Sequence, residues 1–352
     1  MENNRRGILN RIRNLCCTGQ SIITLTPLLF KYVNQLIPHD VHAFALTSST
    51  TIPYMYYHSG LNEQFVHLLR SNIELFLDPK TEQHICWLSN PKLPKSGNLL
   101  CPDDQYYLSN NYQMMVRASG LHHTLDLRFE LFGTPCGGLS LYRGIGLGFT
   151  EQDAKLLEKV GQFIEHALQY QDTDYTKYAL ELEQAMFIVD QNNDILMMTD
   201  SAKSLLSLLE VHYDCWEYGK TLPKTCYQII NELKYGINIP KIMVNIPDGV
   251  LIIRAEWMNS PFKDKQWIAI YLNHQLPRSM LIWTKLESSG LSPQQCLVAY
   301  LLITGEEKKS IMEKNSISPS VLKDCIKAIY QTFNVHSLTE LIDIAHRWTA
   351  ST

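Results

Sequence analysis

Three serine caps constrain the fold of this chain most strongly, because they divide residues 291–347 into short helices. Ser292 and Ser318 each precede a proline, and a serine N-cap followed by proline at the first helical position is a typical helix start. Ser337 opens the sequence Ser-Leu-Thr-Glu, a capping box in which the serine and glutamate side chains bond backbone amides reciprocally. The spacing predicts four helices, with the second and third joined by a tight turn.

Apolar residues recur at helical spacing in each of these segments, so each predicted helix has a face for a common core. Two helices joined by a tight turn and braced by a helix on either side permit a DNA-binding helix-turn-helix. A small four-helix packing module without DNA fits the same pattern equally well.

The same segment resembles the output domain of the LuxR family of transcription regulators. The resemblance is carried by Leu291-Ser-Pro-Gln-Gln, Gly305, Ile311, Ile317-Ser318, Ser320-Val-Leu-Lys323, Ile329 and Val335-His-Ser-Leu-Thr-Glu-Leu341. It implies a domain that binds double-stranded DNA, commonly as a homodimer, with its third helix in the major groove.

The resemblance also implies a DNA-contacting set of residues in this chain. The set consists of Lys309, Ser318, Ser320, Lys323, Asp324 and Lys327. The first three are positioned for phosphates and the last three for base edges. Hydroxyls, lysines and a helix N-terminus are the usual phosphate ligands. A lysine on an exposed helical face is otherwise simply solvated, so each assignment keeps that alternative.

The chain departs from the family in its third helix and in its charge. The family usually has Thr-Val-Lys-x-His where this chain has Val321-Leu-Lys-Asp-Cys325. From Leu286 onward, six Lys and Arg residues stand against seven Asp and Glu residues. Because cationic side chains supply most of the non-specific affinity for DNA, this balance predicts weak binding per protomer. It leaves open a second function, a protein–protein interaction module whose helix-turn-helix no longer binds DNA.

The first half of the chain has the pattern of a mixed α and β domain. Two strand-like runs, Leu125–Phe132 and Leu139–Arg143, are joined by a short hairpin connection, and Thr150 is the N-cap of the helix that follows. The apolar positions of that helix make it the candidate for part of a homodimer interface. The segment resembles the GAF-like sensory domains found ahead of LuxR-type output domains, over Val116–His123, Gly138–Arg143 and Phe149–Leu157.

The middle of the chain has a different order of elements. Strands at Ala185–Val189 and Ile195–Met198 precede a short helix. Two further strands flank Pro247-Asp-Gly249, where Asp-Gly between alternating apolar runs is a strong hairpin signal, and Gln266–Leu272 supplies a last strand. Two strands, helices and three antiparallel strands is the order of a PAS domain, which this segment resembles.

We therefore expect an α+β protein with three domains. A GAF-like sensory domain is expected over residues 1–172 and a PAS-like domain over 173–276, both with antiparallel sheets and helices. An all-α, four-helix LuxR-type helix-turn-helix domain is expected over 277–352. The predicted function is a DNA-binding transcriptional regulator whose sensory domains respond to a signal, either a small molecule or a protein.

Composition argues against several other classes of protein. No run approaches the ~18 apolar residues of a membrane-spanning helix, and the arginines at 5, 6, 11 and 13 indicate a solvated amphipathic first helix instead of a signal peptide. Nine cysteines without a C-x-x-C indicate reduced thiols in a cytoplasmic protein, with neither disulfides nor zinc. The sequence contains no H-E-x-x-H, phosphate loop or G-x-S-x-G, so we expect no catalysis, no metal and no cofactor.

The pattern leaves the ligand-binding residues unassigned. Seven aromatic residues fit either an aromatic pocket or an ordinary core and rim: Tyr54, Tyr56, Tyr57, Trp87, Tyr106, Tyr107 and Tyr112.

Overall fold

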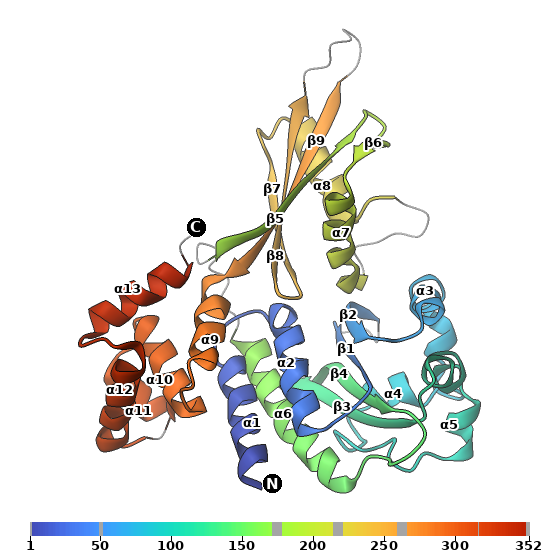
Figure 1. The fold of residues 1–352 in the computed structure, drawn as a ribbon. Coiled ribbons are helices and arrows are strands. Elements are labelled where there is room, and N and C mark those ends of the chain that lie inside the picture. The colour runs from blue at the N-terminus through green and yellow to red at the C-terminus, as the bar shows by residue number, and fades with distance from the viewer. Residues whose placement is uncertain are drawn as a thin grey trace.

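Two antiparallel sheets, with helices packed against them, form the framework of the chain (Figure 1). The computed structural model describes residues 2–48, 52–170, 178–213, 221–258, 266–315 and 317–349. The sheets and helices confirm the expected α+β class. The expected boundary at residues 172 and 173 lies outside the described residues, and the division into three domains stays a prediction. Among the helices of the described part, none has the length and apolar character to cross a bilayer.

The first sheet has four strands in the order β2-β1-β4-β3. They are β1 (Val41–Thr47), β2 (Pro53–Ser59), β3 (His123–Leu131) and β4 (Thr134–Arg143). The hairpin turns at Phe132 and Gly133, both with positive φ, so β4 begins at Thr134 and not at Leu139 as predicted. The sequence pattern missed this start because proline and glycine are poor strand formers. Pairing with β3, and at Gly137 and Gly138 also with β1, holds this stretch in the sheet.

Three helices cover one face of this sheet: α1 (Glu2–Cys16), α2 (Ile22–Leu36) and α6 (Glu151–Gln169). The first helix is amphipathic, as predicted, but it is not simply a solvated surface helix. Its residues Ile12 and Leu15 are buried between α2 and α6. The apolar face of α6 packs against β3 and α1. The part of α6 that we considered for a homodimer interface is therefore covered within the chain.

The opposite face of the sheet is covered by short helical segments. They are α3 (Glu63–Ser71), η1 (Ile73–Phe76), α4 (His84–Leu88), α5 (Asp104–Leu108) and η2 (Asn111–Val116). Their apolar side chains form a separate small core with Val41, Ala43 and Tyr142 of the sheet.

The second sheet has five strands in the order β6-β5-β9-β8-β7. They are β5 (Tyr178–Val189), β6 (Ile195–Met198), β7 (Lys241–Ile246), β8 (Gly249–Met258) and β9 (Trp267–Pro277), with α7 (Asp200–Ser207), η5 (Leu208–Val211) and α8 (Lys224–Lys234) between β6 and β7. Gly249 pairs with Ile246, so the predicted hairpin turns at Pro247 and Asp248. The order of elements is the one expected of the middle segment, whereas its identity as a PAS domain stays a prediction.

Five helices complete the described chain. They are α9 (Arg278–Ser288), α10 (Pro293–Ile303), α11 (Lys308–Asn315), α12 (Pro319–Phe333) and α13 (Leu338–Thr349). The last four are the helices that the serine caps predict. The capping box at Ser292 is formed with Gln295.

The C-terminal helices share one hydrophobic core with the N-terminal helices. Trp283 of α9 is fully buried and meets the ring of Tyr300 at 5.8 Å. The Tyr300 hydroxyl donates to the carbonyl oxygen of Thr18 at 3.2 Å, and the Asn14 side chain donates to the carbonyl of Pro293 at 3.1 Å. Segments at opposite ends of the sequence are thus joined by both apolar and polar contacts.

Candidate functional site

The third helix of the predicted helix-turn-helix is α12, and both of its ends are defined by the local sequence. The Ser318 hydroxyl accepts a hydrogen bond from the amide of Val321 at 3.3 Å, and Pro319 occupies the first turn. Asn334 ends the helix in the left-handed conformation, with a φ of 52°, which asparagine adopts more readily than most residues. Five of the six residues assigned to DNA contact therefore lie at the cap and along the first turns of a well-bounded helix.

One face of α12 is buried and the other is open to solvent. Leu322, Cys325 and Ile329 pack into the core that α12 shares with α10. Burial raises the pKa of the Cys325 thiol, and the neighbouring Asp324 carboxylate raises it further. Cys325 is accordingly a neutral core residue and not a nucleophile.

All six residues of the predicted DNA-contacting set are exposed. Five belong to α12 or its cap, and Lys309 lies in the first turn of α11. A shallow groove runs along α12 and includes four of the set with neighbouring polar residues: Ser320, Lys323, Asp324, Lys327, Gln331, Asn334 and His336.

The exposed face of α12 has the donors and acceptors needed to read base edges, but little net charge. Lys323 and Lys327 are one turn apart, and Asp324 lies on the same exposed surface. A carboxylate in the major groove accepts from the amino group of cytosine, whereas nearby phosphates repel it. The surface is therefore chemically suited to polar recognition and weak in electrostatic attraction to a polyanion.

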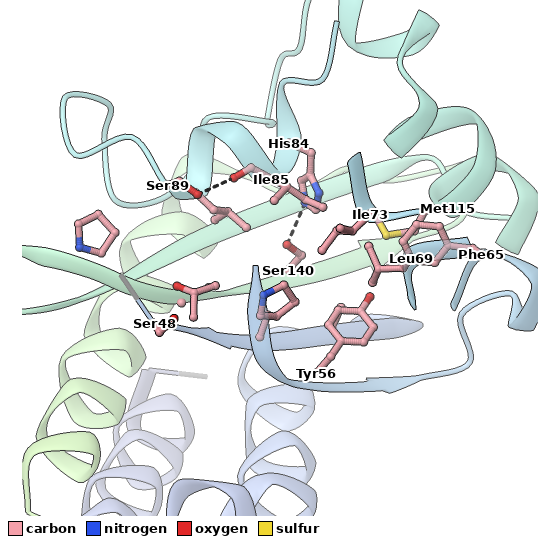
Figure 2. A pocket seen from close by; sticks show the side chains of 18 of the residues that line it. Ser48, Tyr56, Phe65, Leu69, Ile73, His84, Ile85, Ser89, Met115 and Ser140 are labelled. Carbon is pink, nitrogen blue, oxygen red and sulfur yellow. Dashed lines mark hydrogen bonds between the residues drawn. The ribbon is translucent and has the colours of Figure 1, made fainter. Parts of the chain in front are cut away.

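A cavity of about 200 Å³ lies in the half of the chain that holds the four-stranded sheet (Figure 2). Its floor consists of the small residues Ala43 and Ala45 of β1 and Gly137 and Gly138 of β4. Its walls come from α3, η1, α4 and η2, through Phe65, Leu69, Ile73, Ile85, Leu88 and Met115.

Tyr56 and His84 are two large polar side chains in the lining of this cavity, which also holds the hydroxyls of Thr47, Ser48, Ser89, Thr134 and Ser140 (Figure 2). His84 is 4% exposed, and its Nε2 lies 3.0 Å from the Ser140 hydroxyl. Its Nδ1 is buried and has no hydrogen-bond partner among the described residues. Burial lowers the pKa of His84 to about 4 and raises the pKa of Tyr56, so both side chains are neutral at neutral pH.

Most of the aromatic residues considered for a pocket lie elsewhere. Tyr56 lines the cavity, whereas Tyr57 lies near Phe30 of α2, at a ring distance of 6.0 Å. Tyr106, Tyr107 and Tyr112 pack against one another in the small core around α5 and η2. The side chain of Trp87 lies outside what the structure describes.

Sequence reasoning missed the cavity floor, although the sequence carries a signal for it. Ala43 and Ala45 alternate with larger residues, as do Gly138 and Ser140. Alternate strand residues share one face of a sheet, so these small residues mark a face where side chains leave space. Only the pairing of β1 with β4 brings the two sets together.

Comparisons with known proteins assign no family to the chain. No protein-family model matches it, and no curated protein sequence matches it. Among solved structures, the crystal structure of the E. coli DhaR(N)-DhaL complex is similar over 76% of this chain and 89% of that chain, with 12% sequence identity and a TM-score of 0.24. A TM-score this low does not establish a common fold, and nothing about function follows from it.

Proposed function

We propose that the chain is a transcription regulator that binds double-stranded DNA through α12. A signal received by the part of the chain that holds the two sheets, before α9, controls this binding. The observation that carries this proposal is the division of α12 into a buried face and an exposed polar face. Lysines and hydroxyls occupy the exposed face, and an α-helix of this kind fits the major groove. The resemblance of residues 291–341 to the LuxR output domain supports the same function.

The remaining parts of the proposal follow from the weak charge of this region. A single recognition helix with little net positive charge is a poor match for one half-site at physiological salt. The functional form is therefore a homodimer on a near-palindromic site. In this proposal the protein works in the cytoplasm as a binding protein, without catalysis, metal or cofactor. The sheet-bearing domains, GAF-like and PAS-like in this proposal, supply the control.

The test is the double substitution Lys323→Ala and Lys327→Ala in the full chain. Gel shifts against a pool of genomic fragments at several salt concentrations measure binding by the wild type and the variant. We expect specific binding to be lost and thermal unfolding to stay unchanged, because both side chains are exposed. Lys155→Ala with Lys159→Ala is the matched control, since these exposed lysines have the same spacing on α6.

Equal affinity of the Lys323/Lys327 variant and the wild type for a selected fragment would contradict the role of α12. A second candidate function, a protein–protein interaction module, is favoured by Asp324 on the exposed face and by the excess of acidic residues. Failure of the wild-type protein to shift any fragment at low salt would favour this second function.

A further inference from the structure

The cavity beside the four-stranded sheet is built into the fold by close contacts between strands. A Cβ atom at Gly137 would lie 2.3 Å from the carbonyl oxygen of Ala45, and one at Gly138 would lie 2.9 Å from a methyl group of Leu88. Larger residues at these positions would disrupt the sheet or collide with α4. The small floor is thus a requirement of the packing, and the space above it is lined mostly by apolar side chains.

The charge of the lining excludes ionic ligands. None of the lining residues that the structure describes is Lys, Arg, Asp or Glu. An ion in such a cavity would lose its hydration without gaining a counter-charge, at a large free-energy penalty. Neutral His84 offers no positive charge to a carboxylate or phosphate at neutral pH. The ligand that fits this lining is uncharged.

The phenol of Tyr56 is a hydrogen-bond donor in the lining, beside the smaller hydroxyls of the serine and threonine residues. Nδ1 of His84 is buried without a hydrogen-bond partner among the described residues, and burial is the cause that raises the pKa of Tyr56, whose side chain lines the cavity. Nδ1 of His84 has almost no accessible surface toward the cavity, so the ligand contact is assigned to Tyr56. A ligand hydroxyl oxygen can accept from the Tyr56 phenol.

The volume limits the size of the ligand. A dry apolar cavity of about 150 Å³ accommodates benzene, and this cavity measures about 200 Å³. A monocyclic molecule with a small substituent therefore fills it, whereas long acyl chains exceed it.

We propose that this cavity binds a small, uncharged phenol or an alcohol of similar size, held by apolar contacts and by a hydrogen bond to Tyr56. Ser140 of β4 and His84 of α4, joined by a hydrogen bond, form a second polar part of the lining. This inference rests on the proposed function in that the ligand would be the signal of the regulator, but the binding itself does not involve DNA.

The test measures binding of 4-methylphenol, toluene and benzoate to the full chain by calorimetry and by ligand-observed NMR. We expect 4-methylphenol to bind more tightly than toluene by about three- to tenfold, the contribution of one neutral hydrogen bond, and benzoate not to bind. Tyr56→Phe keeps the apolar shape and should reduce the affinity for 4-methylphenol to that for toluene. Ala45→Phe fills the floor and should abolish binding of both.

Three outcomes would overturn the inference. They are absence of 4-methylphenol binding at millimolar concentration, tighter binding of benzoate, and unchanged 4-methylphenol affinity in Tyr56→Phe. The Tyr56→Phe comparison holds even if Ala45→Phe fails to fold. Gel shifts on the same preparation separate the two proposals, because lost DNA binding with intact phenol binding contradicts only the proposed function. Lost phenol binding with intact DNA binding contradicts only the cavity assignment.

Discussion

At the scale of single residues, the half-buried His42 and the buried His84 link the stability of the protein to pH. His42 stacks on Phe30 with a ring distance of 3.9 Å, and burial, together with the nearby His39 and His58, lowers its pKa to about 3. His84 is buried in the lining of the cavity, and burial lowers its pKa to about 4. Both side chains resist protonation in the folded chain more than in the unfolded chain, where the pKa of a histidine has its ordinary value of 6.5.

We expect the free energy of unfolding to fall as the pH falls from about 6.5 to about 4. In this window the unfolded chain binds protons at both histidines and the folded chain does not, so acid favours unfolding. Each site contributes a slope of at most about 1.4 kcal/mol per pH unit. Urea unfolding of His84→Gln across this window should show a shallower dependence than the wild type. An identical pH profile for both proteins would contradict a neutral, buried His84.

Asp324 is the residue whose charge most limits DNA affinity in the proposed function. We expect Asp324→Asn to bind cognate and random duplexes more tightly, because the change removes repulsion from phosphates and asparagine can bond adenine in two places. Stability should change little, since Asp324 is exposed. Side-by-side gel shifts measure the effect, with Asp343→Asn on the exposed face of α13 as the matched control. No gain on either duplex would argue against a groove-facing Asp324.

At the scale of elements, several of the helices that the sequence predicts begin at a side-chain cap. The helices with Thr150, Ser292 and Ser318 at their starts have cap hydrogen bonds from the side chain, and all three were predicted. The N-caps of α2, α8 and α9 make no such bond, and none of these helices was predicted. Tertiary packing determines these helices, and a local pattern does not record it.

The same distinction applies to the candidate sites. The exposure of the α12 residues could be predicted because helical spacing places them away from the apolar face of one helix, whereas their contact with DNA stays a prediction. The cavity could not be predicted, because it joins Ala45, His84 and Gly138 from segments far apart in the sequence. Their proximity depends on strand order and on the placement of α4, which no local spacing encodes.

The contact between β1 and β4 depends on the absence of a side chain at Gly137. Its φ of 153° and the 2.3 Å approach of an added Cβ to the Ala45 carbonyl oxygen leave no room for alanine. We expect Gly137→Ala to lower the free energy of unfolding by about 1–3 kcal/mol, measured by urea unfolding. Gly7→Ala is the control and should raise it by about 0.5–1 kcal/mol, because Gly7 lies in α1 with no atom near its added Cβ. Equal stability of Gly137→Ala and wild type would show that the strands separate easily.

At the scale of the whole molecule, the hydrophobic core runs from the first sheet through α1 and α2 into the C-terminal helices. The Tyr32 hydroxyl bonds the Glu287 carboxylate, which joins α2 to α9. The other carboxylate oxygen of Glu287 is buried and has no partner among the described residues. This pair is therefore a polar link between α2 and α9. Removal of the Tyr32 hydroxyl would leave the Glu287 carboxylate poorly solvated.

We expect Tyr32→Phe to lower the free energy of unfolding by about 1–3 kcal/mol, because it leaves the Glu287 carboxylate with less hydrogen bonding. Glu287→Gln in the Tyr32→Phe background should restore much of this loss, since an unpaired amide is tolerated better than an unpaired charge. Urea unfolding of the four proteins of this double-mutant cycle measures the coupling. Strict additivity of the two changes would mean that α2 and α9 are not linked through this pair.

For the regulator proposed above, the shared core has a consequence for the exchange of domains. In a chimaera that grafts residues 278–349 onto a foreign domain, the surface of α10 around Tyr300 loses the covering that α1 now provides. Such an exposed patch promotes aggregation. A transplantable output unit of this chain therefore includes the first two helices, although more than two hundred residues separate them from it in the sequence.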